Sequence, residues 1–262
     1  MQTTRILDLN IWNYNDPWSV RRDLIISLIL ETNPDIIALQ EVRYQDWIDP
    51  RHQADQILAG LTGYSAVWNS AAYWSPEQTG NRGQQWEGLA ILSRHPIVDR
   101  RMARLERDMT DPRNHFERLI LGAQIRLPKS PLWLFNTHFP LSARARERIV
   151  PVALDFVTQT AHDLPFVFTG DFNAEPTELP IQYLTGQAQI DGHSGNLGDA
   201  WTICHPGEDG YTFSAWKPEK RIDYMFVSAN VQVQSIAVVG SSSHQEQVTP
   251  SDHGGLFADL AI

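Results

Sequence analysis

Short segments in which apolar and polar residues alternate recur along the whole chain. Segments with apolar residues three or four positions apart lie between some of them. The first pattern is typical of half-buried strands and the second of amphipathic helices. We therefore expect strands at 5–12, 35–42, 88–98, 119–127, 132–139, 166–170, 221–227, 231–239 and 255–261, the third of them broken by Pro96.

Helices are expected between several of these strands. One covers 24–29 and ends at Asn33-Pro34, because the residue before a proline disfavours helical geometry. A second lies around 57–61 and a third at 143–160, where Pro151 predicts a kink or a boundary. No Gly/Ser-rich linker divides the chain, so one domain of stacked sheets with outer helices is expected over 1–262.

Two segments are predicted to be long loops, one over 73–86 and one around Asn114. A third loop-rich region is expected from the strand at 166–170 to about position 210. Long loops in compact domains are often functional, although a variable surface loop is the simpler explanation for each one.

The composition narrows the class of protein. The 262 residues are 42% hydrophobic, which is enough for a large core. The single cysteine, Cys204, excludes an intrachain disulfide and fits a reducing compartment. No stretch approaches the roughly 20 apolar residues that span a bilayer, and the first residues lack a secretory leader pattern. We expect a soluble, cytoplasmic protein without a membrane segment.

The net charge of −10 argues against a broad basic surface for nucleic acid. It still permits a nuclease that holds phosphates through a metal ion and a few arginines. A long polyanion would be repelled except at local basic spots, so a small or single-stranded substrate is favoured slightly.

Residues of the types that bind metal ions or transfer protons lie at the ends of several expected strands, within them or just before them. They are Asn10, Glu41, His138, Asp171 with Asn173, Asp223, and Asp252 with His253. Each alone has an ordinary explanation, such as turn chemistry for Asp and Asn or an ion pair for Glu. Together they suggest a site at the ends of rigid strands. Carboxylate and amide oxygens without cysteine suit Mg²⁺, Mn²⁺ or Ca²⁺, and histidines beside them suit phosphoester hydrolysis.

Seven segments, in order, resemble the motifs of the endonuclease/exonuclease/phosphatase superfamily, which includes the deoxyribonuclease-I-like nucleases, deadenylases, neutral sphingomyelinases and inositol-phosphate 5-phosphatases. They are LNIW, LQEV, EGLAILSR, NTHFP, GDFNAEP, RIDYMFV and SDHGGLFADL. Each segment is weakly specific, but their order extends over essentially the whole chain. The resemblance implies a four-layer α/β/β/α sandwich, with two mixed, mostly antiparallel sheets flanked by helices.

The resemblance also implies roles for these residues. Glu41 is the main ligand of Mg²⁺ or Mn²⁺, with Asn10 and Asp252 in the same metal region or at a second site. Asp171 orients or deprotonates the attacking water.

The remaining polar residues have implied roles around that water. Asn173 holds Asp171 or a phosphate oxygen. His253 donates to a phosphoryl oxygen while Asp223 fixes its tautomer. His138 assists protonation or stabilises charge near the leaving group, and Glu87 supports that histidine.

The substrate remains open on sequence grounds. Arg43 matches a position that contacts the nucleic-acid backbone in the deoxyribonuclease branch, although an ordinary surface arginine explains it equally well. Aromatic residues near the motifs are a mild indication of a base- or sugar-bearing ligand. The prediction is a metal-dependent phosphoesterase that acts on a phosphodiester or phosphomonoester, in a nuclease-like manner. The alternatives are a phosphatase, a phospholipase-C-type enzyme, a silent phosphate-binding homologue, and a plain structural protein.

Overall fold

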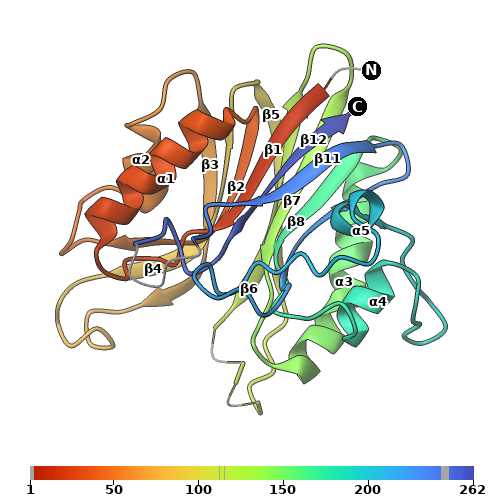
Figure 1. Cartoon of the computed structure of the whole chain (residues 1–262). Coiled ribbons are helices and arrows are strands. Elements are labelled where there is room, and N and C mark those ends of the chain that lie inside the picture. Colours follow the sequence, from red (N-terminus) through yellow and green to blue (C-terminus); the bar gives the residue numbers. More distant parts are fainter. Residues whose placement is uncertain (1–2, 112, 115, 243–247) are drawn as a thin grey trace.

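The structure is a computed structural model that describes residues 3–111, 113–114, 116–242 and 248–262. Over these residues the strands form two six-stranded sheets that pack face to face, with helices on their outer sides (Figure 1). No helix in this part of the chain has both the length and the apolar character that a membrane span needs.

The first sheet has the strand order β11-β12-β1-β2-β4-β3. Its strands are β1 (Thr3–Asn10), β2 (Ile36–Gln45), β3 (Ser65–Trp74), β4 (Gln85–Ser93), β11 (Gln232–Val239) and β12 (Gly255–Ala261). β1 and β2 are parallel, whereas the other pairs are antiparallel. Helix α1 (Trp18–Thr32) connects the parallel pair, and α2 (Gln53–Leu58) follows β2. α1 ends at Asn33, which adopts the left-handed conformation.

The second sheet has the order β5-β6-β7-β8-β10-β9 and repeats this arrangement. Its strands are β5 (Ile97–Leu105), β6 (Arg118–Arg126), β7 (Pro131–His138), β8 (Phe166–Asp171), β9 (Gly198–Asp199) and β10 (Asp223–Val227). The parallel pair is β7 and β8, connected by α3 (Ala143–Ala161). Two short helices, α4 (Leu179–Leu184) and α5 (Ala200–Cys204), follow β8.

Three apolar clusters hold the layers together. One lies between the sheets and includes Ile6, Leu121 and Val167. The second packs α3 and α4 on the outer face of the second sheet. The third packs α1 and α2 on the first sheet. Burial of these aliphatic side chains is the main stabilising term of the fold. The arrangement confirms the expected four-layer sandwich of two mixed sheets.

Some local expectations were wrong. The expected strand at 88–98 is two strands, because Pro96 marks the crossover from β4 of one sheet to β5 of the other. The loop expected at 73–86 is present at 75–84, and two residues at each end belong to β3 and β4. β3 is an edge strand without a buried apolar face, so its sequence carried little strand signal.

Two further details differ from the expectation. α3 continues through Pro151 without a boundary. The region expected to be loop up to about 210 contains α4, β9 and α5, which are six residues or shorter. Such short elements lack a full period of apolar positions and give almost no sequence pattern.

Candidate active site

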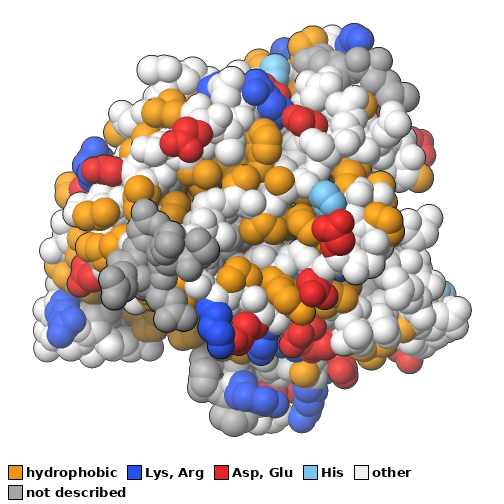
Figure 2. All heavy atoms as spheres, in the orientation of Figure 1, with side chains coloured by type: hydrophobic (Ala, Val, Ile, Leu, Met, Phe, Trp, Pro, Cys, Tyr) orange, Lys and Arg blue, Asp and Glu red, His pale blue; other side chains and the backbone are white. Residues whose placement is uncertain are grey.

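The carboxyl ends of the two parallel strand pairs meet at one end of the sandwich. Parallel neighbours end at the same edge of a sheet, so β1 and β2 deliver their last side chains together, as do β7 and β8. Between them lies a cleft of about 580 Å³ whose lining includes Glu41, His138, Asp171, Asp252 and His253. Figure 2 shows charged side chains of both signs at the lower end of the molecule, near the loop between β5 and β6.

Asp171 occupies the centre of the cleft because of the glycine before it. Gly170 has φ +141°, and a Cβ atom there would lie 2.0 Å from the Thr137 carbonyl oxygen. The close approach of β7 and β8 therefore requires glycine at this position. The Asn173 N–H donates to Oδ1 of Asp171 over 2.8 Å, which leaves Oδ2 facing the two histidines. The side chain of Asn173 donates to the Phe139 carbonyl instead.

His253 is held by Asp223. Its Nδ1 lies 2.9 and 3.1 Å from the two carboxylate oxygens of Asp223, and the Thr212 hydroxyl donates to the same carboxylate. Nε2 of His253 lies 3.8 Å from Oδ2 of Asp171. Burial lowers the pKa of His253, but the carboxylates of Asp223, Asp171 and Asp252 together outweigh this effect and raise the pKa to about 10, with Asp223 contributing most. His253 is therefore a protonated donor at neutral pH, in the orientation expected from the sequence.

Burial and the Asp223 carboxylate raise the pKa of Asp171 to about 7. The His253 imidazolium and the hydrogen bonds from Asn173 and Asn10 act in the opposite direction. A carboxylate whose pKa lies near the working pH can both hold and accept a proton. The arrangement therefore suits a general base for water.

His138 has a neighbour that the sequence did not reveal. Nη1 of Arg118, at the start of β6, lies 3.0 Å from Nδ1 of His138. A guanidinium can only donate, so Nδ1 accepts and the proton of the neutral ring is on Nε2, 3.4 Å from Oδ2 of Asp171. Burial and then Arg118 hold the pKa of His138 well below its usual value. His138 is therefore a neutral hydrogen-bond donor and not a proton source for a leaving group.

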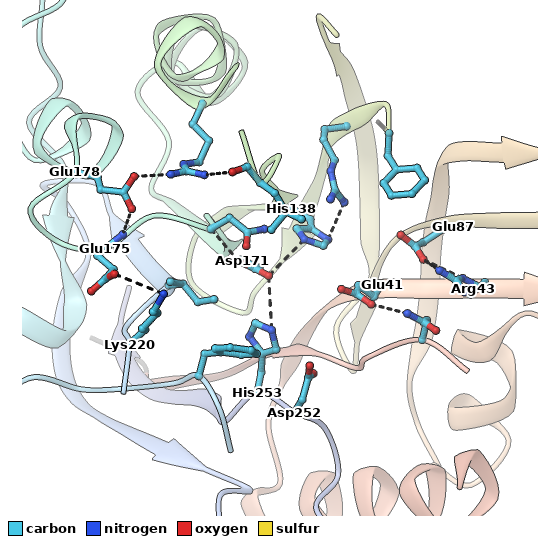
Figure 3. Close-up of a pocket in the computed structure, with 18 residues that line it drawn as sticks. Glu41, Arg43, Glu87, His138, Asp171, Glu175, Glu178, Lys220, Asp252 and His253 are labelled. Atoms are coloured by element: carbon cyan, nitrogen blue, oxygen red, sulfur yellow. Dashed lines mark hydrogen bonds and ion pairs between the residues drawn. The ribbon is translucent and has the colours of Figure 1, made fainter. Parts of the chain in front are cut away.

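Glu87 does not contact His138 in the way the resemblance implied. It accepts hydrogen bonds from Nε and Nη2 of Arg43, on the neighbouring strand β2. Burial raises the pKa of Glu87 despite this ion pair. The direct partner of His138 is thus Arg118, while Glu87 is paired with Arg43 (Figure 3) and lies close enough to Arg118 to interact with its charge.

Glu41 reaches the cleft because β2 is irregular at this point. The register shifts by one residue between Leu39 and Val42, and Glu41 has φ +54°. Such a bulge changes the direction of a side chain along the strand. The Asn13 side chain donates to Oε2 of Glu41 over 2.7 Å, and Asn10 donates to Oε1 over 3.3 Å. These bonds fix the carboxylate toward the cleft.

Asn10 bridges the two halves of the site. Its amide nitrogen donates to Glu41 and, over 3.1 Å, to Oδ2 of Asp171, while its oxygen accepts from the Trp12 N–H. The amide oxygen keeps a second lone pair, so it can still contact a cation beside Glu41. Asn10 therefore links the two carboxylates, and its role as a metal ligand stays a prediction.

Asp252 faces Glu41 across the cleft. Burial raises the pKa of Asp252 to about 6, and the Glu41 carboxylate adds to the shift while His253 opposes it. Figure 3 shows Glu41, Asp171 and Asp252 directed toward the same open space. Three carboxylates around one opening, without a thiolate, form an oxygen donor set that fits a hard divalent cation.

One closer group of potential ligands does not fit a cation equally well. Among the described residues, Asp171, Asp223 and His253 offer atoms that all lie within 4.8 Å of one another. Nδ1 of His253 and the Asp223 carboxylate already bind each other, which favours a role in proton transfer. We interpret this trio as a proton-handling group and place the cation region at Glu41.

Four contributors to the site were missed from the sequence. Asn13 and Arg118 lie in segments without a strand-end motif, and Thr212 lies in an irregular region. Arg21 of α1 is almost fully buried and lies before the helical segment expected at 24–29. Asn13 was the most accessible to prediction, because it lies three residues after Asn10 in a polar stretch.

Comparisons with known proteins show which family and which fold the chain resembles. A model described as "Endonuclease/Exonuclease/phosphatase family" matches residues 9–253. Nocturnin of Drosophila melanogaster is 24% identical over 94% of this chain, which spans only 42% of that protein. A "Putative neutral sphingomyelinase" of Caenorhabditis elegans is 24% identical over 98% of the chain and 66% of its own length. The crystal structure of an endonuclease/exonuclease/phosphatase from Bacteroides vulgatus has a TM-score of 0.77 and 22% identity, with full coverage of both chains.

Proposed function

The chain belongs to the endonuclease/exonuclease/phosphatase family, and from this premise we propose that it is a divalent-metal-dependent phosphoesterase that cleaves a phosphodiester with an activated water. One observation carries the proposal: Oδ2 of Asp171 lies 3.4 Å from His138 Nε2 and 3.8 Å from His253 Nε2. A base and two donors thus surround one position at which a phosphate can bind.

Each residue has one task in this proposal. Asp171 accepts the proton of the attacking water. The His253 imidazolium and the neutral His138 ring donate to phosphoryl oxygens as negative charge develops on them. Asp223 keeps His253 protonated and oriented. Asn173 fixes Asp171 through its backbone N–H.

A cation would be held by Glu41, with Asp252 beside it. Few protein ligands converge there, which suits Mg²⁺ or Mn²⁺, because these ions complete their coordination with water and substrate phosphate. When bound, the cation supplies Lewis-acid stabilisation of the developing charge. A cation would also favour the ionised form of Asp171 and so strengthen its role as a base.

The central test is hydrolysis of bis-p-nitrophenyl phosphate with Mg²⁺ or Mn²⁺. We expect His253→Ala and Asp171→Ala to lose at least about 100-fold in kcat, because each removes a donor or base in the transition state. His193→Ala, at an exposed histidine outside the cleft, is the matched control. Circular dichroism checks that the variants fold. Wild-type activity in His253→Ala, or none above buffer in the wild type with metal bound, would reject the proposal.

A second test concerns the cation. Calorimetric titration with Mg²⁺ should give binding to the wild type and at least about tenfold weaker binding to Glu41→Ala, since the main carboxylate ligand is lost. Glu147→Ala, at an exposed acid of α3, controls for general charge effects. If Glu41→Ala and the wild type bind Mg²⁺ with equal affinity, Glu41 is not a ligand of the cation.

A lipid substrate is the second candidate, favoured by the sphingomyelinase relative. A panel of oligonucleotides, sphingomyelin and sugar or inositol phosphates, with and without EDTA, separates the two. We also propose that residues 1–262 form one domain and that the protein works in the cytoplasm, where its lone Cys204 would remain reduced.

A further inference from the structure

A second groove, of about 480 Å³, opens beside the catalytic cleft. It lies where the edge strand β3 of one sheet approaches β5 and β6 of the other. Nη1 of Arg104 spans the gap, with hydrogen bonds of 3.2 Å to the Ala71 carbonyl and 2.7 Å to Glu117. Phe116 lines both the groove and the cleft, so the two spaces adjoin.

The groove is rich in exposed aromatic rings. Tyr73 and Trp86 form a cross-strand pair with ring centroids 4.8 Å apart, and their exposed fractions are 46% and 36%. Trp74 and Phe116 form a second pair, at 5.3 Å. The Trp74 ring also lies under the Arg43 guanidinium, 5.8 Å away, and Arg43 lines the cleft. An aromatic path therefore leads from the catalytic centre into the groove.

Two polar atoms in the groove have no partner. Ser70 Oγ and Arg107 Nε are buried and make no hydrogen bond to any described residue. Such groups are costly to bury unless a ligand or water satisfies them. Gln78, whose oxygen accepts from the Ser75 N–H, keeps its amide donors available. The groove thus combines flat apolar faces with unsatisfied polar groups and two arginines.

We propose that this groove binds the unpaired bases of a single-stranded nucleic acid whose scissile phosphate lies in the catalytic cleft. This assignment rests on the proposed phosphodiesterase function. Aromatic rings stack on any base, the Gln78 amide can donate to a polar base edge, and Arg107 can pair with a flanking phosphate. Arg107 supplies a local positive charge on a chain with net charge −10, whereas Arg104 is paired with Glu117.

The features of the groove favour nucleic acid over a lipid. A lipid tail needs a continuous aliphatic surface, whereas this lining alternates aromatic rings with polar and charged groups. A purely structural role for the Tyr73–Trp86 pair, as a cross-strand contact on an edge hairpin, is the remaining alternative.

The test compares two substrates in one variant, Tyr73→Ala/Trp86→Ala. We measure kcat/KM for a short labelled oligonucleotide and for bis-p-nitrophenyl phosphate, which is too small to enter both spaces. Since stacking contributes about 1–3 kcal/mol per base, the ratio of the two should fall about tenfold or more. Trp68→Ala is the matched control, because Trp68 is an exposed ring on β3 that stacks on His52 outside the groove.

Binding is measured separately, by quenching of tryptophan fluorescence with the same oligonucleotide in EDTA. We expect about tenfold weaker binding for the double variant. For Arg107→Gln we expect the slope of log K against log salt concentration to fall by about 1, the loss of one phosphate contact. An unchanged substrate ratio and unchanged binding would overturn the groove assignment, as would an equal loss on both substrates. If the wild type binds sphingomyelin vesicles and the double variant does not, while both still bind the oligonucleotide, the groove binds lipid.

The two proposals fail in different ways. If the wild type hydrolyses neither substrate, the proposed function is wrong. The fluorescence titration still shows whether the groove binds the oligonucleotide. If it hydrolyses the small diester and the double variant behaves as the wild type on the oligonucleotide, only the groove assignment is wrong.

Discussion

Asp171, Asp223 and His253 share one electrostatic environment, and this makes the catalytic residues interdependent. The Asp223 carboxylate contributes most to the rise of the His253 pKa to about 10, and after burial it also contributes to the pKa of about 7 for Asp171. A single buried charge therefore prepares both the donor and the base. Tightly coupled groups titrate together, so the apparent pKa values describe Asp171, Asp223 and His253 as a set and not each residue alone.

The prediction at the residue scale is a bell-shaped profile of kcat/KM. Activity should rise with pH as Asp171 loses its proton, below its metal-free pKa of about 7 because bound Mg²⁺ favours the carboxylate, and fall through about 10 as His253 loses its own. In Asp223→Asn both limbs should shift to lower pH, since the charge that raises both pKa values is gone. Profiles with bis-p-nitrophenyl phosphate at one saturating Mg²⁺ concentration measure this. An alkaline limb that stays in place in Asp223→Asn would contradict the coupling.

At the scale of elements, helix α1 supports the loops of the site through one buried arginine. Arg21 is 1% exposed. Its guanidinium donates to the backbone carbonyl oxygens of Ile11, Trp12, Asn13, Asn15 and Pro250. It therefore fixes the turn that carries Asn13 and the segment just before Asp252. Burial lowers the pKa of Arg21 to about 10, which leaves the group charged at neutral pH.

We predict that Arg21→Lys destabilises the fold by about 3 kcal/mol and weakens activity. A lysine ammonium has three N–H donors on one atom, whereas a guanidinium has five donors spread over a plane. The lysine therefore leaves several buried carbonyl oxygens without a hydrogen bond. Urea unfolding gives the free energy, and Mg²⁺ titration shows whether the Glu41 region is disturbed. Arg22→Lys, at the neighbouring and more exposed arginine, is the control. Equal stability of Arg21→Lys and Arg22→Lys would show that the carbonyl network contributes little.

The sequence identified the elements with a clear period and missed those without one. Strands that end in Asp171, His138 and Asn10 were recognisable because their apolar runs are fully buried. β3 was not, because an edge strand with half-buried side chains has no apolar face to reveal it. The resemblance implied that Glu87 supports His138. In the structure Arg118 contacts His138 and Glu87 contacts Arg43, because side-chain partners depend on which strands are neighbours.

At the scale of the whole molecule, the two sheets share one interior. The largest apolar cluster draws side chains from both sheets. A buried hydrogen bond of 2.8 Å joins Gln40 of β2 to Asn136 of β7, and the same Gln40 amide donates to Asp8. Unfolding either sheet would expose the core of the other and leave these polar groups unpaired.

We therefore predict a single cooperative thermal transition for residues 1–262, in agreement with one domain. Mg²⁺ that binds the folded state should raise Tm in proportion to ln(1 + [Mg²⁺]/Kd). Calorimetry tests both statements, with Glu41→Ala as the variant whose Tm should not respond. Two separate transitions, or a van't Hoff enthalpy well below the calorimetric one, would show that the sheets unfold independently.

The sequence by itself determined which chemical groups are present and that they follow strands. Its apolar periods depend only on local geometry, and a strand end places its next polar residue at the edge of a sheet whatever the partner strands are. The tertiary structure decided the partners. Arg118 at His138, Arg43 at Glu87, Arg21 under the loops and the aromatic groove beside β3 all join segments far apart in the chain. Such contacts follow from how the two sheets pack, and no local pattern encodes that packing.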